Sequence, residues 1–275
     1  MAEFDKVAIV GVGLIGGSIG LALRERKLAR EVIGIGRREK VLQEAKRLGA
    51  IDRGTTSLAE GVAEAEIVGG CTPVDRVAET ALQVAEHCPQ RATITDAGST
   101  KETIVAAVDA GLTGRRDGPW FIGSHPLAGD HRTGVESARA DLFDGRKTIV
   151  TPTDHSHRAS TLDVTRFWRG LGADVVAISP AEHDAALAAT SHLPHLVAYA
   201  LAFATPKELL PLAASGWRDT TRIAGSDPKL WRPIFASNRQ HMIEALDRFT
   251  EALALMRESL DTGDDEQLLA MLERA

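Results

Sequence analysis

A short apolar strand pattern near the N-terminus leads directly into a glycine turn and then into a helical pattern. The apolar run covers residues 6–10, and Gly11, Gly13 and Gly16 follow it. Gly11 permits a tight turn, Gly13 lets a pyrophosphate approach the backbone, and Gly16 lets the helix pack closely on the strand. The helix start also offers free N–H groups and a positive dipole end. A lone glycine triplet fits an ordinary strand-to-helix turn, but both flanking patterns favour a dinucleotide site. The site residues predicted here are Gly11, Gly13, Leu14, Ile15 and Gly16.

The composition fits a globular protein that binds a small ligand. The 275 residues are 44% hydrophobic and 25% charged, as in ordinary globular proteins. A net charge of −6 argues against a nucleic-acid partner, because no basic surplus is present to neutralise phosphates. Glycines and Arg24 interrupt the N-terminal apolar stretch, so we expect neither a signal peptide nor a membrane partner. Cys71 and Cys88 are expected to be reduced packing residues in a cytoplasmic protein.

Strand-like and helix-like segments alternate up to residue 178, which predicts a parallel sheet covered by helices. Several of the strands end in small or polar clusters, and the carboxyl ends of parallel strands form the ligand crevice of such sheets. Thr72 and Pro73 follow one of these strands and are assigned to the cofactor site. The further strands are predicted at 31–36, 66–71, 92–95, 120–122, 147–151 and 174–178.

The end of the second predicted strand indicates which cofactor is preferred. NAD-binding sites usually carry an acidic residue there to bind the ribose hydroxyls. This chain has Gly36 followed by Arg37 and Arg38. Two cations opening a helix oppose its dipole, but they would suit a 2′-phosphate. We expect NADP or NAD as cofactor, with NADP preferred.

The strand signals end at residue 178, and the following residues have helical patterns. Pro180 and Pro228 stand at helix starts, and residues 242–257 are apolar every three or four positions. The predicted fold is α/β, with a Rossmann-type doubly wound, mainly parallel sheet in residues 1–178. Residues 179–275 are predicted to form an all-helical domain, whose apolar faces require a partner.

Two strand ends carry candidate catalytic side chains. His125 lies between Ser124 and Pro126, where it should face the crevice and could accept a proton near neutral pH. A histidine bonded only to backbone is the alternative. Ser99 follows another strand end and is expected to cap the helix that contains Lys101, while its hydroxyl could also reach an imidazole.

The segment Ser191–His195 interrupts a helical pattern with Pro194, which should kink the backbone. His192 and His195 are three residues apart, but no nearby carboxylate or cysteine completes a metal site, so no metal is predicted. A hydrogen bond from His195 to substrate or cofactor is favoured. Arg222 is either a solvated surface charge or a bidentate partner for a carboxylate.

These motifs together resemble the prephenate and arogenate dehydrogenases of tyrosine biosynthesis. The resemblance covers nearly the whole chain in the same order, and its most specific segments are His-Pro-Leu-Ala-Gly at 125–129 and Ser-His-Leu-Pro-His at 191–195. The other matching segments are the glycine turn, 96–101 and 219–224.

The resemblance implies oxidative decarboxylation of prephenate to 4-hydroxyphenylpyruvate by a homodimer that uses NAD or NADP. His125 would take the proton of the ring hydroxyl while a hydride leaves the same carbon, and Ser99 would orient them. His195 would hold the substrate and Arg222 would bind its ring carboxylate. A base at this position fits the chemistry, because loss of the hydride makes the ring hydroxyl acidic. Ser124, His192, His131 and Arg132 are the further substrate-binding residues expected.

One departure from the family leaves the substrate preference open. Many members carry Thr and Glu after the last glycine of the 125–129 motif, whereas this chain has Asp130, His131 and Arg132. An arogenate or dual-specificity cyclohexadienyl dehydrogenase is therefore the nearest alternative. A β-hydroxyacid or imine reductase would need a catalytic lysine, and Lys207 and Lys229 lie in no supporting motif. A cofactor-sensing regulator would not need His125, Ser99 and Arg222 together.

Overall fold

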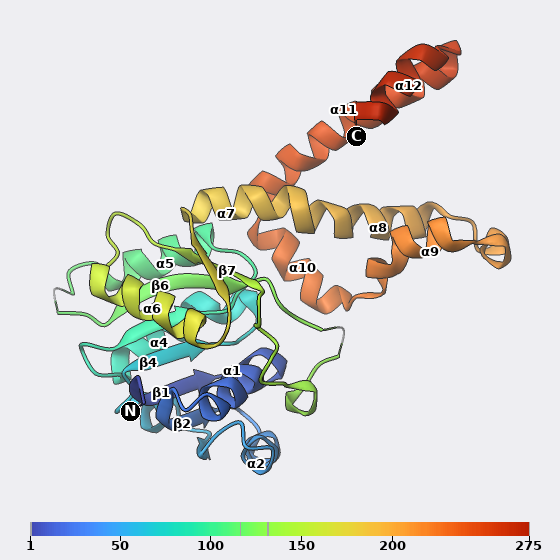
Figure 1. Ribbon diagram of the computed structural model, residues 1–275. Coiled ribbons are helices and arrows are strands. Elements are labelled where there is room, and N and C mark those ends of the chain that lie inside the picture. The colour runs from blue at the N-terminus through green and yellow to red at the C-terminus, as the bar shows by residue number, and fades with distance from the viewer. Residues whose placement is uncertain (1, 116, 131, 275) are drawn as a thin grey trace. The chain divides into compact units, whose positions relative to one another are not determined.

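The computed structural model describes residues 2–115, 117–130 and 132–274. These residues contain one eight-stranded sheet with the strand order β3-β2-β1-β4-β5-β6-β7-β8 (Figure 1). The strands are parallel except at the β6–β7 pair, so the mainly parallel doubly wound sheet is confirmed. The strands are β1 (Phe4–Val10), β2 (Ala29–Ile35), β3 (Arg53–Thr55), β4 (Ile67–Gly70), β5 (Thr93–Asp96), β6 (Trp120–Pro126), β7 (Lys147–Thr151) and β8 (Asp174–Ala177).

Helices cover both faces of this sheet, because the central strands are apolar on both sides. One hydrophobic core contains side chains of α1 (Leu14–Glu25), α2 (Glu39–Arg47) and α6 (Arg158–Gly170). The core of the other face includes side chains of α3 (Leu58–Val62), α4 (Val77–His87), α5 (Glu102–Leu112) and α10 (Pro228–Ser237). The strand order reverses between β1 and β4, and ligands of open α/β sheets bind at such a switch point.

The chain divides into two compact units that are described separately. The sheet unit comprises the residues up to Asp184 together with Pro228–Ser237, and the helical unit comprises Ala185–Asp227 and the residues from Asn238 on. The sequence predicts a boundary at residue 178, with all later residues, including those of α10, in the second domain. The compact units of the structure instead group α10 with the sheet, because Ile234 of α10 packs in a core of the sheet unit.

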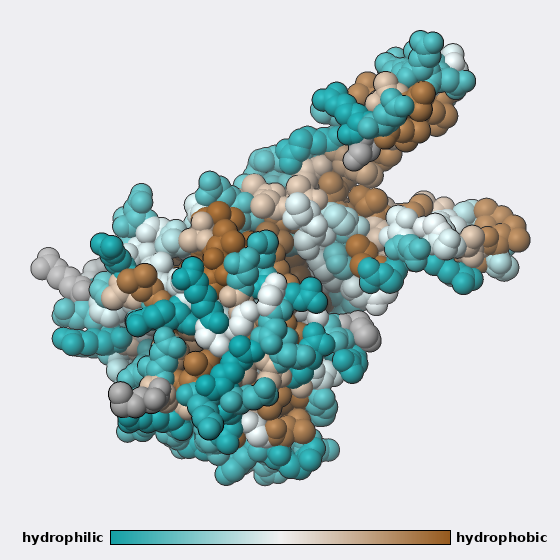
Figure 2. Space-filling model, viewed as in Figure 1, coloured by the Kyte–Doolittle hydropathy of each residue, from teal (hydrophilic) through white to brown (hydrophobic). Residues whose placement is uncertain are grey.

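The helical unit contains α8 (Leu193–Ala204), α9 (Ser215–Thr221), α11 (Arg239–Thr262) and α12 (Asp265–Arg274). Gly263 ends α11 in the left-handed conformation, which glycine adopts at many helix C-termini. Many large apolar side chains of this unit are exposed, and Figure 2 shows brown surface along α11 and α12. Leu255 and Leu260 are 51% and 68% exposed, and Phe203 is 94% exposed.

The proline in the helical pattern is accommodated by a change of helix type. α7 (Pro180–Leu187) leads into a π-helical turn at Ala188–His192, and Pro194 then lies in the first turn of α8. A proline in a first turn loses no intrahelical hydrogen bond, since that N–H is unpaired in any case. The interruption expected at Pro194 therefore takes the form of a π-helical turn followed by a new α-helix.

By length and composition, the described residues contain one helix that could cross a membrane, Pro180–Ala204. The helices of globular proteins pass the same test. This one includes the buried side chains of His183, Asp184 and His192. Charged and titratable groups are costly in hydrocarbon, so its composition does not favour a membrane span.

Local boundaries differ from the sequence predictions at three places. The three-residue strand β3 was not predicted, because Arg53–Thr55 is too short to show a period. β6 continues through His125 to Pro126, since its last four residues pair antiparallel with β7. The capping role of Ser99 is wrong: α5 begins at Glu102, and a distant carboxylate bonds its first N–H groups.

Candidate active site

The turn between β1 and α1 has the geometry that the sequence predicts. Gly11 has a φ of +96°, and a Cβ there would lie 2.5 Å from the Cys71 carbonyl oxygen. A Cβ on Gly16 would lie 2.2 Å from the carbonyl oxygen of Gly11 and 2.9 Å from Ile9. Gly13, by contrast, faces open space, with no described atom within 4 Å of a Cβ position. The turn therefore needs glycine at two positions for its own packing and leaves the third open to a ligand.

The start of α1 suits a pyrophosphate. Gly13 is the N-cap residue, no side chain caps the helix, and its first turn carries no acidic residue. The N–H groups of the first turn and the positive dipole end are thus available to an anion. Leu14 and Ile15 open the helix and pack partly against the core of that face.

Two further segments of the predicted cofactor site lie after β4 and β2. Thr72 and Pro73 lie just beyond Cys71 after the end of β4, and the buried Thr72 hydroxyl has no hydrogen-bond partner among the described residues. Gly36 follows β2, while Arg37 and Arg38 are exposed just before α2. The unpartnered Thr72 hydroxyl and the open space beside Gly13 both fit a dinucleotide bound at the switch point.

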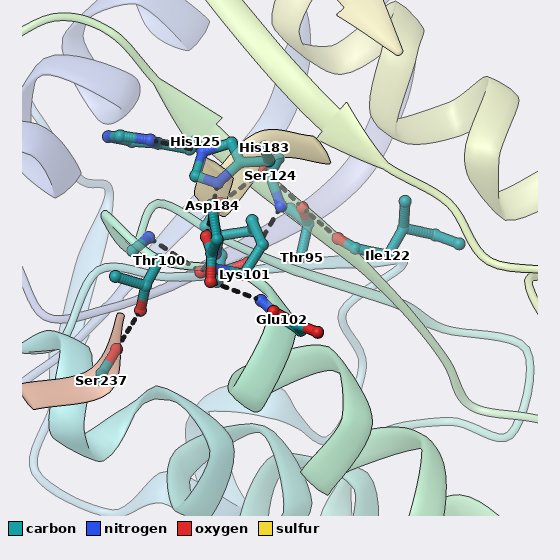
Figure 3. A network of polar contacts seen from close by, with 12 residues as sticks. Thr95, Thr100, Lys101, Glu102, Ile122, Ser124, His125, His183, Asp184 and Ser237 are labelled. Carbon is teal, nitrogen blue, oxygen red and sulfur yellow. Dashed lines mark hydrogen bonds and ion pairs between the residues drawn. The ribbon is translucent and has the colours of Figure 1, made fainter. Parts of the chain in front are cut away.

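His125 is the second-last residue of β6 and therefore lies at the carboxyl end of that strand. It is half-buried, and its Nδ1 lies 2.9 Å from Nε2 of His183 on α7. His183 is fully buried, and its own Nδ1 lies 2.7 Å from Oδ1 of Asp184. Figure 3 shows the two imidazoles and the carboxylate in sequence. The candidate base thus stands at the outer end of a buried polar chain.

Asp184 also holds the start of α5. Its two carboxylate oxygens accept hydrogen bonds from the backbone N–H groups of Lys101 and Glu102, at 2.7 and 3.0 Å. Burial raises the pKa of Asp184, but the hydrogen bonds from His183 and from these two N–H groups outweigh it. The pKa of Asp184 is therefore below its usual value. The carboxylate is ionised at neutral pH and serves only as an acceptor.

A second buried network joins the ends of β5 and β6. Lys101 and Asp96 form an ion pair with both side chains almost fully buried, and the Ser124 N–H donates to Asp96 Oδ1 at 3.0 Å. Burial lowers the pKa of Lys101, against the opposing effect of the Asp96 carboxylate. The Ser124 hydroxyl donates to the Asp96 carbonyl oxygen and accepts from Trp168 Nε1 at 2.8 Å. These contacts favour a role for Ser124 in fixing β6; its predicted contact with substrate stays a prediction.

Ser99 is half-buried between β5 and α5. The described imidazole partner of His125 is His183, which the sequence analysis did not single out. Thr100, the next residue, contacts the Ser237 hydroxyl at the end of α10 (Figure 3). The orienting role of Ser99 remains a prediction.

In the helical unit, the two histidines of the 191–195 segment have different surroundings. His192 is buried, and its Nδ1 lies 3.0 Å from Nδ2 of Asn238. Burial lowers the pKa of His195, a backbone hydrogen bond with Ile223 opposes this, and the Arg222 charge lowers the pKa further. Within the described residues no group of three or more potential metal ligands is found.

The remaining predicted substrate residues are charged and lie in loops or short helices. Arg222 is exposed at the start of a 3-10 turn, Arg222–Gly225, and is close enough to His195 to affect its charge. Arg132 forms a two-point contact with the Asp130 carboxylate, including one of 3.0 Å between Nη2 and Oδ2. His131 lies outside the described residues.

Sequence reasoning missed His183 and Asp184, although one signal was present. Ser179 and Glu182 cap the start of α7 reciprocally, as a Ser-x-x-Glu pattern predicts. That pattern locates a helix start but gives no reason to connect it with His125, 58 residues earlier. The connection exists only in three dimensions.

Comparison with known proteins agrees with this geometry. Residues 19–177 match the family model described as the prephenate dehydrogenase nucleotide-binding domain, and residues 179–274 match that of the prephenate dehydrogenase dimerization domain. A prephenate dehydrogenase of Bacillus subtilis is 35% identical over 98% of this chain and 74% of its own length. A cyclohexadienyl dehydrogenase of Zymomonas mobilis is 31% identical over 98% of this chain and 93% of its own length.

A solved structure extends the likeness to the fold. The prephenate dehydrogenase of A. aeolicus, in complex with hydroxyphenyl propionate and NAD+, is 33% identical and aligns with a TM-score of 0.90. The alignment covers 98% of this chain and 95% of that one. The glycine turn, the histidine at the end of β6 and both matched domains lead to one conclusion: this chain belongs to the prephenate dehydrogenase family.

Proposed function

We propose that this protein is a prephenate dehydrogenase that oxidises and decarboxylates prephenate to 4-hydroxyphenylpyruvate. The observation that carries the proposal is the half-buried His125 imidazole at the carboxyl end of β6, at the same edge of the sheet as the glycine turn. Family membership over nearly the whole chain supports the same activity.

Oxidative decarboxylation of prephenate needs a single base, placed beside the oxygen of the ring hydroxyl. His125 accepts the proton of the ring hydroxyl as a hydride leaves the carbon that carries it. The bond to the ring carboxyl group then breaks, carbon dioxide leaves, and the electron pair makes the ring aromatic. His125 returns its proton to the resulting phenolate oxygen. The bound nicotinamide supplies the hydride acceptor.

The remaining residues bind and orient. Arg222 binds the ring carboxylate through its planar fork, which matches two carboxylate oxygens. His195 donates or accepts a hydrogen bond to the substrate, and Ser99 orients the reacting hydroxyl. The lowered pKa of His195 keeps that imidazole neutral, so it adds no positive charge next to Arg222.

The cofactor is a nicotinamide dinucleotide, and we propose that NADP is preferred over NAD. Gly11, Gly13, Gly16 and the Thr72 hydroxyl hold the part that both cofactors share. Arg37 and Arg38 are exposed after β2 and have no ion-pair partner among the described residues, so they can bind a 2′-phosphate. The A. aeolicus relative was solved in complex with NAD+, which supports a nicotinamide dinucleotide as the cofactor.

The cofactor proposal is tested with the double variant Arg37→Ser/Arg38→Ser. Each charge-assisted hydrogen bond is worth about 1.5–3 kcal/mol, so kcat/KM with NADP should fall by at least about tenfold. The value with NAD should change little. Equal or better kcat/KM of the unaltered enzyme with NAD contradicts the preference.

The exposed leucines of α11 and the matched dimerization domain support a homodimer formed by the helical unit.

We place this enzyme in the cytoplasm, where the reduced state of Cys71 and Cys88 would be maintained. Burial raises the pKa of Cys71 to about 12 and that of Cys88 to about 11, which disfavours the reactive thiolate form of both side chains at neutral pH.

A second candidate function is arogenate or dual-specificity dehydrogenation. It is favoured by the cyclohexadienyl dehydrogenase relative and by the Asp130–Arg132 pair in place of the usual residues. The deciding experiment is a spectrophotometric assay of the purified protein with prephenate and then arogenate, each with NAD and with NADP. Turnover of prephenate well above that of arogenate supports the first proposal, and the reverse supports the second. Absence of turnover with both substrates overturns both.

A further inference from the structure

The base proposed above has a buried support that its assigned role does not include. His125, His183 and Asp184 form a chain of polar contacts. Nδ1 of His125 lies 2.9 Å from Nε2 of His183, and Nδ1 of His183 lies 2.7 Å from Oδ1 of Asp184. His183 and Asp184 are 0% and 1% exposed, so neither can contact a substrate directly. A buried pair that ends on a half-exposed imidazole acts through that imidazole.

The chain determines which nitrogen of His125 carries the proton. The Asp184 carboxylate only accepts, so Nδ1 of His183 must donate to it. A neutral His183 then offers Nε2 as an acceptor, and Nδ1 of His125 must donate to it. The lone pair of His125 consequently lies on Nε2, the nitrogen that faces away from His183. One imidazole tautomer is selected in the same way whenever its other nitrogen has a fixed partner.

We propose that His183 and Asp184 are positioning residues that hold His125 in its Nδ1-protonated tautomer, leaving Nε2 as the proton acceptor of the reaction. When the substrate hydroxyl transfers its proton to Nε2, His125 becomes an imidazolium. The Nδ1–H group of His125 keeps its hydrogen bond to Nε2 of His183, and no proton is transferred from His125 to His183. This role rests on the proposed function only for the identity of the substrate.

Asp184 is held independently of the two histidines. Its oxygens are fixed by the backbone N–H groups of Lys101 and Glu102, so the carboxylate does not depend on His183 for its position. Among the described residues, the other charged groups beside the chain are the Lys101–Asp96 ion pair, from the N-cap of α5 and the end of β5, and Glu102 at the start of α5. Lys101 and Asp96 neutralise each other through their ion pair.

The first test uses His183→Gln and His183→Leu. Glutamine can accept from His125 with its carbonyl oxygen and donate to Asp184 with its amide, but it does not titrate, whereas leucine does neither. Positioning predicts that kcat for the Leu variant falls by roughly 10²-fold, the cost of a base misplaced by about 1 Å, and that the Gln variant restores most of it. The KM for the nicotinamide cofactor should stay unchanged in both.

A loss of kcat in His183→Gln as large as in His183→Leu overturns the proposal, because it would mean that His183 must take up a proton. A folded His183→Leu enzyme with wild-type kcat overturns it as well. Folding is checked by thermal unfolding, with His157→Gln as the matched control. His157 also uses Nδ1 in a local contact, with the Ser160 N–H at the start of α6.

The second test needs neither substrate nor activity. Histidine labelled with ¹⁵N in the unliganded protein reports which ring nitrogen carries hydrogen, and the His125→Asn variant assigns the His125 signals. The proposal predicts a protonated Nδ1 and an unprotonated Nε2 above the histidine titration range, and loss of this preference in His183→Leu. The opposite tautomer, or an equal mixture, in the unaltered protein overturns it. If neither prephenate nor arogenate is oxidised, this measurement still decides the positioning role by itself.

Discussion

The sheet unit and the helical unit of this chain differ in how much of their large apolar side chains they bury. In the sheet unit, large apolar residues such as Trp168 and Phe143 are fully buried, and the polar groups at the ends of β5 and β6 bond one another. In the helical unit, Phe203, Leu255 and Leu260 are exposed. The sheet unit is complete within one chain, whereas the helical unit has apolar surface that a second chain can cover.

The same difference applies to the residues proposed for catalysis. His125 lies on a strand and is held by a buried chain of partners, which suits a base that must stay fixed within fractions of an ångström. Arg222 is exposed at the start of a short 3-10 turn, so less of the protein surrounds its side chain. The proposed base thus lies in the sheet unit, and the proposed carboxylate anchor lies in the helical unit.

The largest effect is expected from His125→Asn in the sheet unit. Asparagine keeps a hydrogen-bonding group but cannot accept the proton, so kcat should fall by roughly 10² to 10⁴ while cofactor binding persists. In the unaltered enzyme, kcat should rise with pH through an ionisation in the histidine range, because only neutral imidazole accepts a proton. Profiles of kcat against pH for both proteins check this. Retention of normal kcat and of the acidic limb would transfer the role of base to His195.

A smaller effect is expected from Arg222→Lys in the helical unit. Lysine keeps the charge but loses the bidentate fork, so substrate use should weaken by about 1.5–3 kcal/mol, or roughly 10- to 150-fold in kcat/KM. The KM for the cofactor should not change. Steady-state kinetics with each substrate varied in turn separate the two, with Arg218→Lys, on the preceding helix α9, as the control. Unchanged KM and kcat for prephenate would exclude Arg222 as the carboxylate anchor.

Leu255→Glu tests whether the exposed face of α11 is a subunit interface. Burial of one leucine contributes about 1.5–3 kcal/mol, so the charge should raise the dissociation constant of the dimer by at least about tenfold. Sedimentation over a range of concentrations measures it. The matched control is Leu162→Glu, because Leu162 is 55% exposed on α6 of the sheet unit. An equal response of the two variants, or none in Leu255→Glu, removes α11 from the interface.

The smallest effect concerns the stability that Asp184 gives to the sheet unit. Since its folded pKa is lowered, its contribution is complete above the unfolded pKa of about 3.9 and is lost as pH falls through the folded pKa. Asp184→Asn removes the charge and at least one of the hydrogen bonds that the carboxylate accepts from His183 and from the N–H groups of Lys101 and Glu102, so it should cost about 1–2 kcal/mol at pH 7.

Urea unfolding between pH 7 and about pH 3 measures this difference, which should shrink toward the acidic end. Ser57→Ala provides the comparison, because Ser57 caps α3 through a hydroxyl that does not titrate. Its stability deficit should stay constant with pH. A deficit of Asp184→Asn that is equally constant would contradict the assigned ionisation.

The amino-acid sequence by itself determined the features that depend on neighbouring residues. Periodicity located most strands and helices, glycine spacing identified the turn at Gly11, and the motif at 125–129 identified the family. Local patterns are reliable there because hydrophobic period, turn geometry and capping act over a few residues. The start of α7 at Pro180, which the sequence predicts, is of this kind.

Only the tertiary structure decided which distant groups meet. Ser99 precedes α5 and looked like its cap, yet Asp184, more than 80 residues later, bonds the first N–H groups of that helix. The π-helical turn before Pro194 and the packing of α10 with the sheet unit likewise result from tertiary packing. A buried donor requires an acceptor but does not specify where in the chain it comes from. Several residues can satisfy the same hydrogen bond, and the folded chain selects the one that its packing brings within 3 Å.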